Sequence, residues 1–303
     1  MRKKWYFGDK FGFLFLFFYL LLYINPLQFV FPAFATSLWK KVIPWFAINL
    51  NQKVITVFPN GSGDTSYNYY QIAFFAMLAF IIALVISMVD RRRDNYRVLL
   101  KWLIVLVRYY LAALMINYGL SKLFYLQFTF LSEVALTRDL GEFSPMGLLW
   151  NFMGYSKGYT MFAGALEFIA GLLLLNRRTH ILGTLMTFGV MLNVMMLNYC
   201  YDVPVKLSST HMVLMSLFLI SLRAERLYAF FISNRKIEPY SYPELIPAKY
   251  YKLKTILKWL MIMAYLSLYI SSMWGHSQNN KSCLLYTSPS PRDQRGSRMP
   301  SSA

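Results

Sequence analysis

Residues 70–89 read YQIAFFAMLAFIIALVISMV, a run of 20 residues without a charged side chain. A helix rises about 1.5 Å per residue, so this run is about 30 Å long as a helix. That length matches the hydrocarbon core of a bilayer. The run therefore predicts a membrane-spanning helix.

Further runs of the same character lie on both sides of it. They cover residues 11–31, 101–124, 159–176, 181–200, 208–222 and 256–274. The run at 208–222 is short and could borrow residues from either flank. The composition agrees, because 57% of the residues are hydrophobic and 15% charged, whereas a soluble domain carries about 25% charged residues. We predict an all-α, polytopic membrane helix bundle with about seven transmembrane helices.

The positions of the Lys and Arg residues predict the orientation. Most of them lie in residues 1–10, 90–101, 177–178 and 223–258, which alternate with segments that hold few. Because basic residues accumulate on the cytoplasmic side, the N-terminus is expected in the cytoplasm. We therefore expect a multi-pass protein embedded in the lipid bilayer of the bacterial cytoplasmic (inner) membrane. The net charge of +18 is divided among these short clusters, so we expect no nucleic-acid partner.

The first apolar run has a second interpretation. A basic start, an apolar stretch and the sequence Ala33-Phe34-Ala35 before Thr36 resemble a secretory signal and its cleavage site. The apolar stretch is longer than the 7 to 15 residues of a usual signal. A retained span is therefore favoured, and cleavage stays open.

The segments between the spans also carry signals. Residues 37–51 mix tryptophans with polar residues, as in a segment that lies at the membrane interface. Ser144-Pro145 predicts a helix start before residues 146–153. Both segments either form a lid over the outer side or are connectors anchored at the interface. The basic loop at 223–258 is either a topology signal or a contact for anionic lipid head groups.

The end of the chain differs from the rest. Residues 283–293, CLLYTSPSPRD, read as the translation of a transposase-based sequencing adapter. We interpret residues 283–303 as an adapter artefact, with natural sequence to about Ser282. Cys200 is then the remaining cysteine, which excludes an intramolecular disulfide or a Cys-x-x-Cys pair.

Lys101 and Lys258 lie at the cytoplasmic ends of their spans, and the other charged residues within the spans are Arg108, Lys122 and Glu167. Each of these three costs roughly 2.5 to 3.5 kcal/mol at the membrane centre, so each is a candidate functional residue. Arg108 and Lys122 are 14 positions apart, about 40° from one another on one helix face. Small residues flank Glu167, which lets a neighbouring helix approach. We expect Glu167 to pair with Arg108, either as a structural ion pair or as a proton-relay or ligand-anchoring group.

Further polar residues extend toward the predicted outer surface. Asn117, Asn193 and His211 are candidates to line a ligand pocket that opens outward. Hydrogen bonds between helices explain such asparagines equally well. His180 and His211 are expected at opposite ends of their helices, and no metal-binding motif is present. We predict no metal site.

The stretch from Arg108 to Ile220 resembles the DoxX-like family of four-helix membrane proteins. The resemblance rests on Arg108, on Gly119-Leu120-Ser121-Lys122-Leu123 and on Glu167 with the Gly171-Leu172-Leu173 run that follows it. It implies a DoxX-like four-helix core at 101–222. Residues 1–100 are then a two-helix extension with an outer interfacial loop, and residues 223–282 a basic loop with the seventh helix.

The resemblance also implies a function. Members of the DoxX-like family are associated with quinone-linked oxidation, so the chain is expected to be a membrane subunit of a quinone-linked oxidoreductase system. Because the chain lacks a cysteine pair, a redox role would depend on a bound quinone or on a redox partner subunit. The alternative is a non-enzymatic carrier or assembly factor that binds a lipid or a small solute. Whether the protein is an enzyme stays open at this stage.

Overall fold

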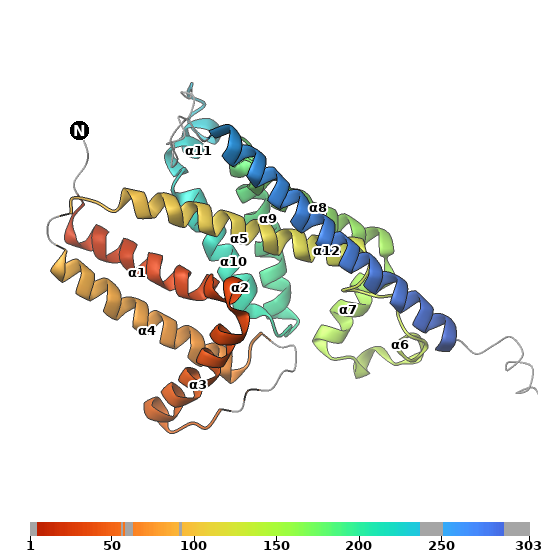
Figure 1. Ribbon diagram of the computed structural model, residues 1–303. Helices are drawn as coiled ribbons and strands as arrows, with labels where there is room; N and C mark the ends of the chain where they lie inside the picture. Colours follow the sequence, from red (N-terminus) through yellow and green to blue (C-terminus); the bar gives the residue numbers. More distant parts are fainter. Residues whose placement is uncertain (1–4, 56, 58–62, 91–92, 237–250, 288–303) are drawn as a thin grey trace, which may run out of the picture. The chain divides into compact units, whose positions relative to one another are not determined.

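The computed structural model describes residues 5–55, 57, 63–90, 93–236 and 251–287, and these residues contain helices and no strand (Figure 1). The elements are α1 (Phe7–Ile24), α2 (Leu27–Val30), α3 (Pro32–Asn51), α4 (Ser66–Val89), α5 (Arg97–Leu123), α6 (Glu133–Thr137), η1 (Leu140–Glu142), α7 (Pro145–Tyr155), α8 (Lys157–Leu175), α9 (His180–Cys200), α10 (Lys206–Ser221), α11 (Ala224–Phe231) and α12 (Tyr251–Thr287).

Among the described residues, six helices are long and apolar enough to cross a membrane. They are α1, α4, α5, α8, α9 and the Thr255–Gly275 part of α12. The pair α10 and α11 forms a seventh candidate if it is counted as one span, although the two helices meet at a 75° bend. This confirms the predicted all-α, multi-pass membrane protein.

Most of the predicted spans agree with the helices to within a few residues, but the first does not. Residues 11–31 were expected as one run, whereas α1 ends at Ile24. Asn25 takes a left-handed conformation with φ of 47°, and Pro26 follows it. The residue before a proline avoids the helical region, and asparagine tolerates the left-handed one. The Asn-Pro pair therefore ends the helix inside the apolar run.

The chain divides into two compact units. The first comprises Met1–Ile116, Ser144–Met146 and Ile169–Tyr240, and the second comprises Asn117–Phe143, Gly147–Phe168 and Ser241–Ala303. Both α5 and α8 contribute residues to each unit. The predicted domains at 1–100, 101–222 and 223–282 stay a prediction.

In the first unit, α1 lies against α4 (Figure 1). Leu14 of α1 and Ala83 of α4 are buried in one cluster with Tyr96. The start of the chain is also fixed to the segment that precedes α5, because the Lys10 ammonium donates to the Arg93 carbonyl at 2.5 Å. These contacts make α1 a packed member of the unit.

A second polar contact joins α1 to α10. The Tyr19 hydroxyl lies 2.6 Å from Nε2 of His211, and Nδ1 of His211 lies 2.6 Å from the Leu207 carbonyl oxygen. A carbonyl accepts only, so Nδ1 carries the proton, and in the neutral ring Nε2 accepts from Tyr19. The Tyr23 ring stacks on the imidazole at 3.9 Å between centroids. Burial of His211 is thereby compatible with full hydrogen bonding.

The interfacial segment predicted at 37–51 is part of α3, which packs on α4. The rings of Trp39 and Phe75 meet edge to face at 4.9 Å between centroids. Trp45 is exposed on the same helix. The short segment before α4 is tied to α10 instead, because the Asp64 carboxylate accepts from the backbone N–H groups of Lys206 and Leu207. Such bonds satisfy donors that a helix start leaves open.

Helix α7 confirms the helix predicted after Ser144-Pro145, with Pro145 as its first residue. Thr160 of α8 is buried and donates to the Met153 carbonyl at 2.6 Å. Helix α12 continues past Cys283 to Thr287. Residues 288–303 of the predicted adapter segment lie outside the described residues, so its origin stays a prediction.

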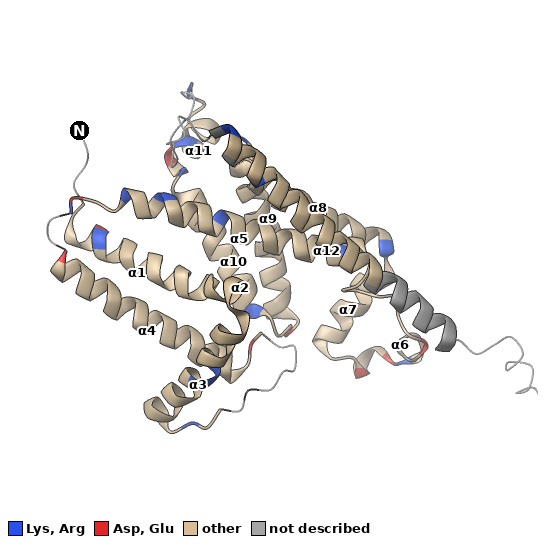
Figure 2. Cartoon of the chain, viewed as in Figure 1, with Lys and Arg blue, Asp and Glu red and all other residues tan. Residues whose placement is uncertain are grey.

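The long helices carry their charges mainly toward their ends, and α4 has none along its length (Figure 2). Large apolar side chains are exposed on its surface, among them Phe80, Ile81 and Val85. A lipid solvent accepts such side chains, whereas water would favour their burial. The surface agrees with insertion into a bilayer.

We predict that α1 is retained after membrane insertion, because Leu14 and the Tyr19–His211 hydrogen bond make it part of the first unit. The purified protein is expected to keep a tag fused before Met1, and its intact mass is expected to include α1. The matched control carries the same tag and a strong signal cleavage site in place of Ala33-Phe34-Ala35. A native product that begins at Thr36 would contradict the prediction.

Candidate functional site

The candidate site begins with a close approach of α5 and α8. A Cβ atom added to Gly119 would lie 2.6 Å from the backbone nitrogen of Phe168, and one added to Gly164 would lie 2.8 Å from the Gly119 carbonyl oxygen. Real Cβ atoms essentially never come within 3.0 Å of another heavy atom. Small residues allow membrane helices to approach this closely. This packing therefore requires glycine at both positions.

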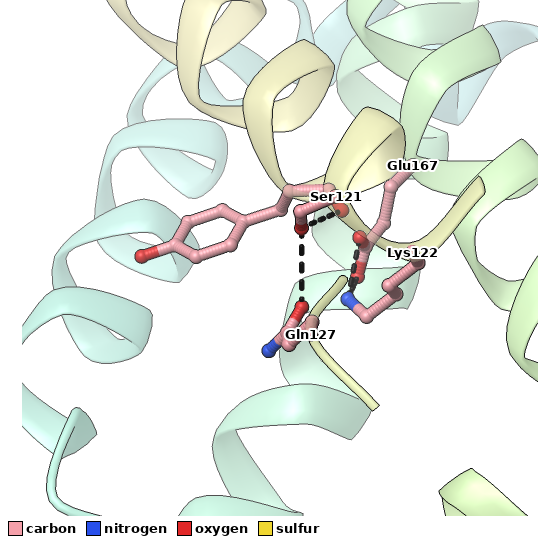
Figure 3. Close-up of polar contacts among 5 residues, drawn as sticks. Ser121, Lys122, Gln127 and Glu167 are labelled. Carbon is pink, nitrogen blue, oxygen red and sulfur yellow. Dashed lines mark hydrogen bonds and ion pairs between the residues drawn. The ribbon is translucent and has the colours of Figure 1, made fainter. Parts of the chain in front are cut away.

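The same contact brings two ionisable side chains together. Lys122 follows Gly119 by three residues and Glu167 follows Gly164 by three, so each shares a helix face with its glycine. The Lys122 ammonium donates to both carboxylate oxygens of Glu167, at 2.5 Å and 2.6 Å. The two side chains are 7% and 3% exposed. Figure 3 shows them reaching toward one another from α5 and α8.

The electrostatics of the pair depend on this mutual contact. A buried ion that loses its partner costs several kcal/mol, so each charge is tolerated because the other neutralises it. Lys122 also lies in the last turn of α5, where the helix dipole favours a cation. Its ammonium is 5.9 Å from the centroid of the Tyr118 ring, within the range of a cation–π contact. Three features thus stabilise the ammonium at this position.

The chain after α5 folds back and fixes the end of the helix. The backbone N–H of Leu126 donates to the Ser121 carbonyl at 2.8 Å, and the Ser121 hydroxyl lies 3.4 Å from Oε1 of Gln127 (Figure 3). The Tyr125 hydroxyl donates to the Gly154 carbonyl of α7. Burial raises the pKa of Tyr125, so this hydroxyl stays a proton donor. The turn holds Lys122 in its place on α5.

A buried amine and a carboxyl in direct contact can do two kinds of chemistry. The proton they share can move, which converts an ion pair into a neutral pair of the same total charge. The ammonium can also donate hydrogen bonds to a carbonyl or an anionic group of a ligand. Ionisable residues within membrane spans commonly mark ligand or proton pathways.

Comparison with known proteins gives this chain a relative. It is 34% identical over 113 residues to a Bacillus subtilis (strain 168) protein whose name reads "Uncharacterized protein YwoB". The aligned residues make up 37% of this chain and 71% of YwoB. The chain belongs to the YwoB family. That name assigns no activity, so the membership carries no function by itself.

No family model matches this member of the YwoB family, and no solved structure matches it. The resemblance to DoxX-like proteins therefore stays a prediction. A bacterial relative and several candidate spans agree with the expected multi-pass membrane protein. The orientation of the helices stays a prediction as well.

The expected partner of Glu167 was wrong. Arg108 and Glu167 both lie near the middle of their predicted spans, but both carboxylate oxygens of Glu167 accept from Lys122. Arg108 is buried in the first unit, where its guanidinium lies 5.0 Å from the centroid of the Tyr109 ring. The glycine contact and the reach of the lysine side chain decided the pairing, and span positions alone did not reveal either.

The other candidate residues have different surroundings. Asn117 accepts from the Tyr265 hydroxyl of α12 at 2.7 Å. Buried Asn198 donates to the Ser209 hydroxyl at 3.0 Å. Both contacts are hydrogen bonds between helices, and a ligand-binding role for Asn117 stays a prediction. Asn193 is exposed on α9, and both ring nitrogens of His211 have intramolecular partners. Ligand-binding roles for Asn193 and His211 stay a prediction.

The sequence interpretation missed the tyrosines. Tyr19 contacts His211, Tyr118 contacts Lys122, and Tyr265 contacts Asn117. Tyr125 donates to the Gly154 carbonyl of α7. In an apolar run, a tyrosine is also explained by the aromatic belt at the membrane interface. A tyrosine and an isolated polar residue at the same predicted depth in two different spans would have indicated such a contact.

Among the described residues, no group of three or more His, Cys, Asp and Glu side chains is placed to hold a metal ion. Cys200 is a free, exposed cysteine.

We predict that Gly164→Ala destabilises the protein by about 1 to 3 kcal/mol, the usual cost of forced overpacking. The added methyl group would lie 2.7 Å from Cβ of Lys122 and would press on the backbone of α5. Gly158→Ala is the matched control, because it lies on the same helix with nothing within 4 Å of the new Cβ. The measurement is thermal unfolding in detergent, and equal midpoints for the two variants would contradict the packing argument.

Proposed function

We propose that the protein is a membrane component of a quinone-linked redox system, in which Lys122 and Glu167 bind the head group of a quinone. The observation that carries the proposal is the direct contact of a buried ammonium with a buried carboxylate. Two ionisable groups in mutual contact provide a hydrogen-bond donor and a proton carrier at one point in the bundle.

The donor set fits the chemistry of a quinone. Quinone carbonyl oxygens are neutral acceptors, and the Lys122 ammonium has three N–H donors, of which the contacts to Glu167 use two. Reduction to the quinol consumes two electrons and two protons. In the proposal, a redox partner subunit supplies the electrons.

The chain's own residues have separate roles in this proposal. Lys122 orients the carbonyl oxygen by hydrogen bonding and stabilises negative charge that develops there. Glu167 holds one of the two protons at its carboxyl group and delivers it to that oxygen, and water supplies the second proton to the other quinone oxygen. Transfer of this proton leaves a carboxylate beside the ammonium, which is the ion pair described above. The pair carries one positive charge before the transfer and is neutral after it, when the carboxylate can accept the next proton.

A second function is favoured by a different observation. The Lys122 ammonium is already bonded to both oxygens of Glu167, and the glycines bring the two helices into backbone contact. An ion pair of this kind can have a purely structural role, which is to hold two helices together. The protein is then a non-enzymatic carrier or assembly factor, as the alternative prediction states.

A single substitution in the Lys122–Glu167 pair lowers stability whether or not the pair has a further function. Each single variant is therefore compared with the double variant. We expect Lys122→Met and Glu167→Met to destabilise the protein by about 3 to 5 kcal/mol each, because each leaves a buried charge alone. The double variant is expected to recover most of the loss, because it leaves no charge. Thermal unfolding in detergent gives the three values. Lys157→Met, an exposed lysine on α8, is the control.

The folded double variant then tests the function. Binding of decylubiquinone is followed by its quenching of tryptophan fluorescence in the purified protein, and we expect at least a tenfold weaker affinity in the double variant than in the native chain. Native affinity in the double variant, or no binding by the native chain, would exclude the quinone site. The structural alternative would then be retained.

A further inference from the structure

The segment from Arg223 to Lys236 combines a short helix with a concentration of positive charge. It contains α11 and holds four basic residues, Arg223, Arg226, Arg235 and Lys236, against one acidic residue, Glu225. Helix α11 meets α10 at 75°. Transmembrane helices tilt by about 20° on average, so α11 lies close to the membrane plane if α10 stands across the bilayer.

The side chains of α11 divide into two faces. Glu225, Arg226 and Ala229 occupy one side, and the apolar side chains occupy the other. On the apolar side, Leu227 lines a small cavity with His180 of α9 and Leu219 of α10. The side of α11 that carries Leu227 therefore lies next to α9 and α10 in the first unit.

Most of the apolar side lacks such cover within the described residues. Tyr228, Phe230 and Phe231 are 61%, 63% and 65% exposed, and Ile232 behind them is 69% exposed. The rings of Phe230 and Phe231 meet edge to face at 4.9 Å between centroids, so they form one aromatic surface. Aromatic side chains are favoured at the level of the lipid head groups.

The end of α11 holds two of the charges close to this surface. Asn234 takes a left-handed conformation with φ of 47°, and the backbone N–H of Arg235 donates to the Ala229 carbonyl at 2.9 Å. This left-handed turn is a common helix end. It folds the chain back on α11, so the backbone of Arg235 lies beside the last turn of the helix. Both side chains are exposed.

We propose that α11 is an interfacial helix whose aromatic face inserts into the membrane and whose basic residues bind anionic phospholipid head groups. The occupant is the lipid leaflet at the end of α10. A helix with an apolar face and basic residues lies in the interface in this way, and each Lys or Arg near an anionic surface strengthens the attraction. The charge of the segment therefore selects anionic over zwitterionic lipid.

The depth of α11 is tested with a fluorescent bimane label at Phe231→Cys. The background carries Cys200→Ser and Cys283→Ser. The matched control is the label at Glu225→Cys, on the polar side of the same helix and about 120° away. In vesicles that contain phospholipids with brominated chains, quenching at position 231 is expected to be at least about twofold stronger than at position 225. Equal quenching at the two positions would overturn the insertion, and so would the absence of quenching at position 231, which a covering protein partner would cause.

The choice of lipid is tested at the same label. Quenching by brominated phosphatidylglycerol is compared with quenching by brominated phosphatidylcholine to give a relative affinity. We expect a preference for the anionic lipid of about fivefold for each participating charge. Arg235→Gln with Lys236→Gln is expected to lower the preference by about fivefold for each charge removed, without changing the depth. The same change at the adjacent exposed pair Lys40 and Lys41 of α3 is the control. A native preference near one, or one that the Arg235 and Lys236 change leaves intact, would overturn the electrostatic part.

Discussion

The contact between the Lys122 ammonium and the Glu167 carboxylate is the constraint on which the candidate site depends. A charge in the hydrocarbon core has no water to stabilise it, so two helices that each carry one must meet at the right height. Gly119 and Gly164 make this possible, because a side chain at either position would separate the backbones. The glycines determine the helix distance, and the charges determine which residues face each other.

Polar contacts without a charge join other pairs of helices, and each contributes less energy than an ion pair. Hydrophobic attraction does not hold helices together in lipid, so neutral polar contacts between helices take part of that role. Tyr19 with His211 joins α1 to α10, Asn198 with Ser209 joins α9 to α10, and Tyr265 with Asn117 joins α12 to α5. Each pair satisfies a polar group that would be costly alone. These contacts explain why isolated polar residues occur in otherwise apolar spans.

The two proposals rest on two regions, which differ in kind. The Lys122–Glu167 pair is enclosed and charge-balanced, as suits a proton carrier or a lock between helices. The segment of α11 is exposed and carries excess positive charge, as suits contact with a lipid surface. Likeness to YwoB covers 37% of the chain, and the function of either region rests on its own geometry.

The sequence by itself determined the fold class, the number of candidate spans and most of their limits, because an apolar run of about 20 residues has few stable alternatives to a spanning helix. It also identified Lys122 and Glu167, since ionisable residues are conspicuous in such runs. Only the tertiary structure decided that Glu167 binds Lys122 and not Arg108, and that Tyr19 forms a hydrogen bond with His211. Periodicity along one helix fixes which side chains share a face, but it does not fix how far one helix slides along its neighbour. That offset follows from the glycine contact and the folded turn after α5, which exist only once the helices are packed.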